Sequence, residues 1–139
     1  MSSELKEDSG SPEVLRRVLV VEDDEALRRI VVRHLERWGY LIREARDGGV
    51  AVAEIRSDAP SLDVVLLDIM LPIVNGVDVA RVVRDEKPEL PIVAYSAAFN
   101  AETQADLRAL GVSHMLDKPF RAEQLRTILS LALNEAPGA

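Results

Sequence analysis

The chain has 139 residues, of which 47% are apolar, and its 24 acidic and 17 basic residues give a net charge of −7. This length and apolar content predict one globular domain with a substantial core, whereas the acidic balance excludes a protein that wraps nucleic acid directly. Because there is no cysteine, the sequence also excludes disulfides, zinc–thiolate sites and thiol catalysis.

The two ends of the chain differ in composition from the part between them. Residues 1–15 are polar and acidic, without the basic start or apolar centre of a secretory signal, and predict a flexible leader. Residues 16–133 form the predicted domain, and residues 134–139 form a frayed tail. No apolar run approaches the roughly 20 residues of a membrane span, so we expect a cytoplasmic protein without membrane contacts.

Apolar runs and helical patterns alternate along the domain. The first run, RVLVVE (17–22), is apolar up to its last residue, which is typical of a strand buried on both faces. A helix follows, capped by Asp23 or Asp24 and ended by Gly39. The further strands are YLIREA (40–45), DVVLL (63–67), PIVAY (91–95) and SHMLD (113–117), and the further helices follow Asp47-Gly48-Gly49 or span 76–84, 101–110 and 121 to about 133.

Apolar residues at helical spacing mark the helix faces that we expect in the core. They are Leu27, Ile30, Val31, Leu35, Trp38, Ala51, Val52, Ile55, Val79, Val83, Leu125 and Ile128, while Arg28, Arg29, Arg33 and Arg37 point elsewhere. The alternation implies parallel strands, since these need crossover connections and right-handed crossovers place helices on both faces. The sequence therefore predicts an α/β domain with a doubly wound five-stranded parallel sheet and five helices. Its ligand site lies beyond the carboxyl ends of the strands.

Polar and charged residues gather at the ends of four predicted strands. These are EDD (22–24), Asp68, YS (95–96) and DKP (117–119). At a common edge, two carboxylates about 4 Å apart repel by roughly 4 kcal/mol at an effective dielectric constant of about 20. Lys118 supplies one positive charge, and a divalent cation supplies the rest. Oxygen ligands without cysteine favour Mg²⁺, or Mn²⁺ in its place.

The acids also suggest a reaction. Asp23 and Asp68 are the candidate direct ligands of the cation, Glu22 acts through water, and the backbone carbonyl of Met70 completes the set. A carboxylate beside Mg²⁺ can attack phosphorus and form an acyl phosphate, so Asp68 is the candidate nucleophile and phosphorylation site.

Three further residues are expected to surround the phosphoryl group once Asp68 has accepted it. Lys118 pairs with one of its oxygens, Ser96 donates a hydrogen bond to another, and Ala97 leaves room for the group. The neighbouring Asp24 has a simpler role, because an aspartate just before a helical pattern is typically a cap.

Four motifs carry a resemblance to a known family. EDD after the first strand, LLDIMLPIVNG around Asp68, YSA after the fourth strand and DKPF after the fifth resemble the receiver domain of bacterial two-component response regulators, of the chemotaxis type. The resemblance covers residues 16–133. It implies a flavodoxin-like sheet of order 2-1-3-4-5, phosphotransfer from a histidine kinase or a histidine phosphotransfer protein, Mg²⁺ dependence, and a cis peptide bond before Pro119. The family's functional residues fall on Glu22, Asp23, Asp68, Met70 (carbonyl), Ser96 and Lys118-Pro119.

One position departs from the family pattern. Many receivers have an aromatic residue three positions before the lysine, which swings inward on phosphorylation, and this chain has Met115 there. Methionine is flexible and fills either of two pockets. We therefore expect either a softer switch or one carried by the loop 97–100 with Phe99 taking part. The candidate switch residues are Ser96, Ala97, Phe99 and Met115.

The family also implies how the signal leaves the domain. We expect a changed surface on the face of the fourth helix, fifth strand and fifth helix, which binds a downstream protein; whether the phosphorylated form dimerises stays open.

The Met70 and Ala98 side chains cannot orient a water, so we expect slow self-dephosphorylation and no other enzymatic activity. Since the chain stops soon after Leu133, we expect no output domain, so the receiver works alone or was cut from a larger protein.

Three alternatives remain. An aspartate-nucleophile phosphatase resembling the dehalogenase family needs a second aspartate two residues after Asp68, where this chain has Met70. A pseudo-receiver that binds partners without phosphorylation usually lacks an acid or the lysine, and all are present here. A structural dimerisation module rests only on Val77 and Val82, two valines that could lie at the surface.

Overall fold

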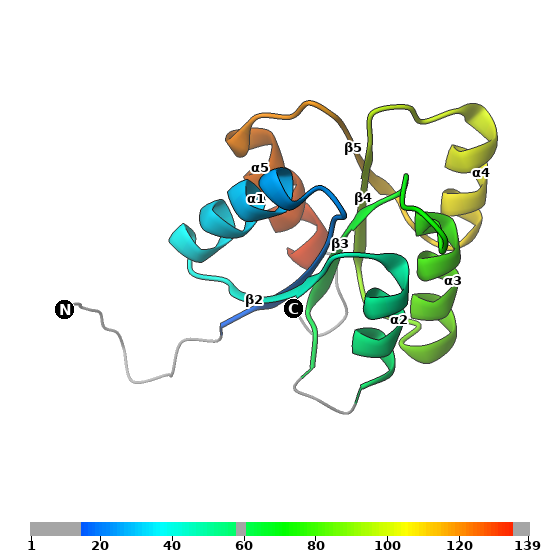
Figure 1. Ribbon diagram of the computed structural model, residues 1–139, viewed down its shortest axis with the longest axis horizontal. Helices are drawn as coiled ribbons and strands as arrows, with labels where there is room; N and C mark the ends of the chain where they lie inside the picture. Colours follow the sequence, from blue (N-terminus) through cyan, green and yellow to red (C-terminus); the bar gives the residue numbers. More distant parts are fainter. Residues whose placement is uncertain (1–14, 58–60, 135–139) are drawn as a thin grey trace.

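The computed structural model describes residues 15–57 and 61–134 (Figure 1). Apart from Leu15 and Asn134, the predicted leader and tail lie outside these residues. Strands and helices alternate along the described chain. Their bounds are β1 (Arg17–Val21), α1 (Glu25–Arg37), β2 (Leu41–Ala45), α2 (Gly48–Arg56), β3 (Val64–Asp68), α3 (Gly76–Glu86), β4 (Ile92–Ser96), α4 (Ala101–Ala109), β5 (His114–Asp117) and α5 (Ala122–Asn134).

The strands form one parallel sheet in the order β2-β1-β3-β4-β5. The predicted doubly wound fold and the strand order implied by the resemblance are both confirmed. Every residue of β3 and β4 is buried, since these central strands are covered on both faces, and their sequences are accordingly almost continuously apolar. The edge strand β2 is more exposed, which accounts for its weaker pattern.

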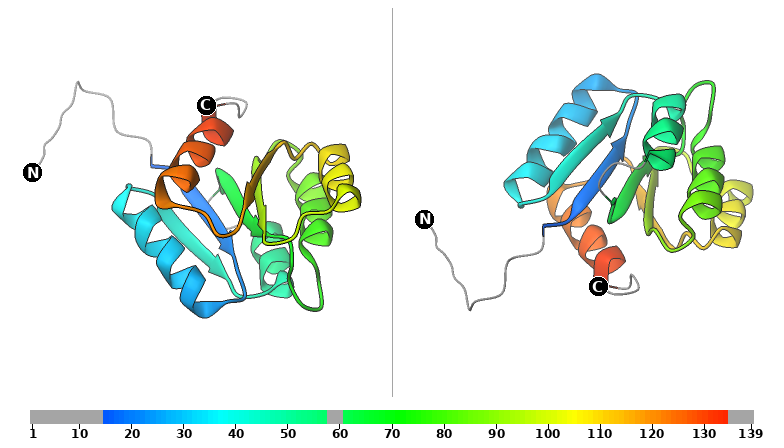
Figure 2. Two further views of the ribbon diagram at one scale, coloured as in Figure 1. Left: turned by 90° about the horizontal axis from the view of Figure 1, so that it is seen from above. Right: turned by 90° about the horizontal axis from the view of Figure 1, so that it is seen from below.

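The sheet separates two apolar cores. The helices α1 and α5 cover one face, and α2, α3 and α4 cover the other (Figure 2). Side chains alternate along a strand, so Val64 and Leu66 pack beneath α1 and α5, whereas Val65 and Leu67 pack beneath α2, α3 and α4. The position of a residue along its strand therefore decides which core its side chain enters.

The helix ends agree with the sequence patterns. Asp24, one of the two predicted caps, begins α1, because its Oδ1 accepts hydrogen bonds from the backbone N–H groups of Ala26 and Leu27. Gly39 and Gly111 follow α1 and α4 with φ angles of 93° and 79°, a conformation that favours glycine. None of the described helices is long and apolar enough to span a membrane.

Five of the residues predicted to face the core are exposed or only partly buried. The prediction for Ile30 was wrong, since its side chain is 51% exposed. The buried stripe of α1 passes through Val31 and Leu35, and at about 100° per residue Ile30 lies roughly 120° from the centre of this stripe. Val52 is only partly buried. Leu27, Trp38 and Ile128 are also partly buried, and they pack against the core beneath α1 and α5.

Candidate functional site

The carboxyl ends of the central strands meet at one edge of the sheet. β1 runs beside β3, and continuation of their register places Glu22 level with Asp68. β3 pairs Asp68 with Tyr95, and β4 pairs Ser96 with Asp117. Segments far apart in the sequence therefore meet at this rim, where parallel sheets bind their ligands.

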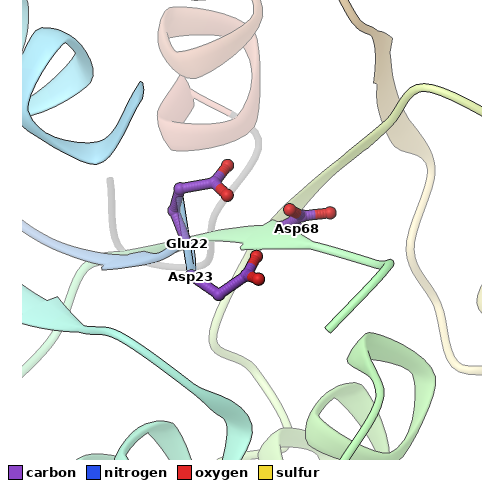
Figure 3. Close-up of side chains that lie close together, drawn as sticks. All are labelled: Glu22, Asp23 and Asp68. Atoms are coloured by element: carbon purple, nitrogen blue, oxygen red, sulfur yellow. The ribbon is translucent and has the colours of Figure 1, made fainter. Parts of the chain in front are cut away.

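Three carboxylates form the centre of the site. Glu22, Asp23 and Asp68 each bring one carboxylate oxygen within 4.8 Å of the others (Figure 3). Glu22 and Asp68 are buried, whereas Asp23 is exposed. At such distances the negative charges repel one another by several kcal/mol, roughly 4 for a pair about 4 Å apart. The cluster therefore needs positive charge.

Lys118 supplies part of that charge. Its Nζ lies 2.9 Å from Asp68 Oδ2 and 3.2 Å from Glu22 Oε1. Burial lowers the pKa of Lys118, but the hydrogen bonds and negative charges of Asp68 and Glu22 outweigh this effect and raise the pKa above its usual value. Lys118 is therefore protonated, and one ammonium cannot balance three carboxylates. The peptide bond between Lys118 and Pro119 is cis.

Two residues to which the sequence pattern assigned no role hold Glu22 in place. The Tyr95 hydroxyl donates a 2.8 Å hydrogen bond to Glu22 Oε1. Arg28, expected to point away, instead donates from Nη1 to the Glu22 backbone carbonyl at 2.8 Å and from Nε to Glu44 Oε1 at 3.0 Å. The contact of Tyr95 with Glu22 could have been predicted from the sequence, because a buried tyrosine hydroxyl needs a hydrogen-bond partner and Glu22 lies at the end of a nearby strand.

The loop after β3 shapes the surroundings of Asp68. Asp68 Oδ1 accepts a 2.9 Å hydrogen bond from the backbone N–H of Met70, whose side chain is exposed. The N–H of Gly76 donates to the Ile69 carbonyl at 2.9 Å and closes the loop. A Cβ at Gly76 would lie 2.4 Å from Ile69 Cα and 2.6 Å from the Asp68 carbonyl oxygen. Only glycine lets α3 begin this close to the candidate nucleophile.

The expected switch residues lie around the end of β4. Ser96 is buried, and its Oγ accepts a 3.1 Å hydrogen bond from the backbone N–H of Ala98. Ala97 is exposed at the rim. Phe99 and Met115 are half-buried and pack against the core beneath α2, α3 and α4. These two apolar side chains therefore border the same core, on the face of the sheet opposite α1 and α5.

The donor set fits a hard divalent cation. Its ligands are carboxylate oxygens, which Mg²⁺ prefers, and the exposed Asp23 leaves a side open to the waters that Mg²⁺ retains. Of the two buried acids, Glu22 has more hydrogen-bond and ion-pair partners. Its Oε1 accepts from Tyr95 and is paired with Lys118, and its Oε2 accepts from the Asp24 N–H at 3.0 Å. Because both oxygens of Glu22 already have partners, we expect Glu22 to contact a cation through water rather than directly.

Comparisons with known proteins agree with this geometry. The family model of the response regulator receiver domain matches residues 18–130. Response regulator MprA of Mycolicibacterium vanbaalenii is 38% identical over 109 residues, which are 78% of this chain and 46% of the relative. The alkaline phosphatase synthesis transcriptional regulatory protein SphR of Synechococcus elongatus is 35% identical over 116 residues, which are 78% of this chain and 45% of the relative. The chain thus spans about half the length of these curated relatives.

Solved structures show the same fold. The chemotaxis protein CheY4 of Vibrio cholerae superposes with a TM-score of 0.80 at 28% identity, covering 86% of this chain and 100% of that one. The receiver domain of a sensor histidine kinase from Pseudomonas aeruginosa superposes with a TM-score of 0.78 at 25% identity, covering 88% and 100%. That structure holds a magnesium ion coordinated in its active-site cleft.

Proposed function

This chain belongs to the response regulator receiver domain family, and on that premise we propose that Asp68 is its phosphoacceptor. Receiver domains accept a phosphoryl group on an aspartate with Mg²⁺, and they interact with histidine kinases. One observation carries the assignment: the Lys118 ammonium lies 2.9 Å from Asp68 in a rim where three carboxylates lie within 4.8 Å of one another. Among the described residues, no other group of three or more acidic or histidine side chains is close enough to hold a metal ion.

The transfer uses the charge arrangement of the rim. An Asp68 carboxylate oxygen attacks the phosphorus of a phosphohistidine on a histidine kinase or a histidine phosphotransfer protein, the O–P bond forms as the N–P bond breaks, and the imidazole leaves with the bonding electron pair. Lys118 turns from Asp68 Oδ2 to a phosphoryl oxygen and keeps its proton. The Ser96 hydroxyl donates a hydrogen bond to a second phosphoryl oxygen, and Ala97 leaves space for the group.

The cation supplies charge neutralisation for the phosphoryl oxygens in this scheme. Asp23, Asp68 and the Met70 carbonyl would hold Mg²⁺, or Mn²⁺ in its place, and Glu22 would contact it through water. Neither the Met70 nor the Ala98 side chain can polarise a water for attack on the acyl phosphate, so self-dephosphorylation is slow. We propose no other enzymatic activity.

Phosphorylation acts as a switch between two surfaces. The phosphoryl group interacts better with Ser96 and Lys118 in one conformation, which shifts the population of a two-state equilibrium. Phe99 and Met115, which already pack against the core beneath α2, α3 and α4, repack as Ser96 moves. The changed surface is the face of α4, β5 and α5, and it binds a downstream protein in the cytoplasm or a second phosphorylated copy rather than nucleic acid.

Incubation with Mg²⁺ and acetyl phosphate, followed by intact-mass measurement, tests the assignment. The wild type should gain the mass of one phosphoryl group, and Asp68→Asn should gain none. Asp24→Asn is the matched control, because asparagine also caps a helix and this variant should still be modified. A pseudo-receiver would gain no mass, and a phosphatase would release phosphate without a lasting mass gain; either result refutes the proposal.

A further inference from the structure

Tyr95 contacts Glu22 of the acidic cluster, and it takes no part in the phosphoryl transfer described above. We propose that Tyr95 is a positioning residue: its hydroxyl holds the Glu22 carboxylate in the orientation that binds a water of the cation, and so sets the affinity of the site for Mg²⁺. This inference rests on the proposed function, because it assumes that the rim binds a divalent cation.

The geometry of Tyr95 is specific. It is fully buried on β4, and its side chain enters the core beneath α1 and α5. From there its hydroxyl lies 2.8 Å from Glu22 Oε1 and 3.3 Å from the Val21 carbonyl oxygen. The carbonyl alone would satisfy a buried hydroxyl, yet the shorter contact is to the carboxylate. Hydrogen bonds to an ionised acceptor are the stronger ones, so Tyr95 orients Glu22 rather than merely filling the core.

Glu22 needs such a partner in both signalling states. It is fully buried, and its Oε1 is shared between the Tyr95 hydroxyl and Lys118 Nζ, at 2.8 and 3.2 Å. When Lys118 turns toward a phosphoryl oxygen, Tyr95 remains the side-chain donor to Oε1. Without Tyr95, Oε1 would then lose both of its side-chain donors and the carboxylate would keep only the Asp24 N–H on Oε2, which is unfavourable for a buried charge. Tyr95 therefore keeps Glu22 in place while Lys118 moves.

The ring of Tyr95 contributes separately from its hydroxyl. Lys118 Nζ lies 5.0 Å from the centre of the ring, and Phe120 contacts the ring edge-on with centroids 5.6 Å apart. Phenylalanine at position 95 keeps these contacts and removes only the hydroxyl. Tyr95→Phe therefore separates the hydrogen bond from the packing.

Mg²⁺ titration by calorimetry tests the inference on the whole chain. Tyr95→Phe should raise the Mg²⁺ dissociation constant about tenfold, as loss of outer-sphere support typically does. Acetyl phosphate should then modify this variant at nearly the wild-type rate once Mg²⁺ is saturating. Tyr40→Phe is the control: Tyr40 is half-buried and lies outside the acidic cluster, so loss of its hydroxyl should leave Mg²⁺ binding unchanged.

A change of less than about twofold in the dissociation constant of Tyr95→Phe overturns the inference, since outer-sphere loss should exceed it. In a Glu22→Gln background the Tyr95→Phe change should have little further effect; an undiminished effect would place the action of Tyr95 elsewhere. Should Tyr95→Phe not fold, the Tyr95 Cζ resonance of the labelled wild type should shift on addition of Mg²⁺ while that of Tyr40 does not, and an unmoved Tyr95 resonance overturns the idea. If the wild type gained no phosphoryl group while Tyr95→Phe still bound Mg²⁺ more weakly than the wild type, phosphoacceptance alone would be refuted.

Discussion

Lys118 Nζ lies 2.9 Å from Asp68 Oδ2, so an ammonium that follows β5 and a carboxylate that ends β3 form a largely buried ion pair. Without Mg²⁺, Lys118→Met leaves Asp68 and Glu22 close together without a cation. We expect the free energy of unfolding in EDTA to fall by about 2 kcal/mol, somewhat less than for a fully buried pair.

Urea unfolding with and without Mg²⁺ checks this expectation. The deficit of Lys118→Met should shrink at saturating Mg²⁺, because the bound cation replaces part of the missing charge and stabilises the native state. Arg29→Met, which removes an exposed ion pair with Glu25, is a control that should change stability by less than about 1 kcal/mol. Equal losses in EDTA and in Mg²⁺ would contradict the charge argument.

Replacing Met70 with asparagine should shorten the life of the phosphorylated form. Met70 follows the candidate nucleophile by two residues and has an exposed side chain, so an amide there can hydrogen-bond the water that attacks the phosphorus of the Asp68 acyl phosphate. One such bond of about 1 kcal/mol corresponds to a roughly fivefold faster decay. The decay of purified phosphoprotein measures the effect, with Ile73→Asn as a polar substitution in the same loop. Equal lifetimes in wild type and Met70→Asn would rule out this role of Met70.

Ile73 is a strained residue whose replacement should stabilise the domain. Its φ angle is 70°, in the left-handed region that β-branched residues rarely adopt, and its side chain is fully exposed. Ile73→Asn relieves the strain and loses no packing, so we expect the free energy of unfolding to rise by about 1 kcal/mol. Thermal unfolding should show a higher midpoint than wild type. A lower midpoint would mean that Ile73 contributes contacts beyond those of an exposed side chain.

Gly76 sets how closely α3 approaches the candidate nucleophile. The Cβ of Gly76→Ala would overlap backbone atoms of Ile69 and Asp68, so the helix must move. We expect a loss of about 2 kcal/mol in stability and slower modification by acetyl phosphate. Gly49→Ala is the matched control, since its Cβ meets only Asp47 Oδ1 at 3.4 Å. If both variants behaved alike, the close approach at Gly76 would not matter.

Stability should decline in alkali. Burial first, and then the charge of Glu22, raise the pKa of Tyr95 above its usual value of 10.0, and the pKa of Lys118 is raised above 10.5. Above these usual values the folded protein retains protons that the unfolded chain has lost, so the free energy of unfolding falls as the pH rises. Urea unfolding in EDTA at about pH 8 and about pH 11 measures the fall. It should be smaller in Tyr95→Phe, and an identical fall would contradict this role of Tyr95.

The apolar runs and their spacing were enough to predict the sheet and the helices that cover it. β3 and β4 are nearly continuous apolar segments because they are buried on both faces, and a polar residue at the end of such a strand indicates its carboxyl edge. The burial of individual helix residues was less predictable. Ile30 fits the apolar pattern of α1 yet lies at the surface, because the width of the buried stripe depends on the packing partner.

The sequence by itself determined which residues stand at the strand ends, and therefore that acids, a hydroxyl and a lysine would meet at one rim. Only the tertiary structure decided how they are held there: Tyr95 and Arg28 bind Glu22 across strands and loops, and Lys118 bridges Glu22 and Asp68. The physical reason is that these contacts join residues far apart in the sequence. Periodicity reports a residue's own burial and its place in a strand, whereas a hydrogen bond between residues 22 and 95 depends on the register and twist of strands that are distant in the chain.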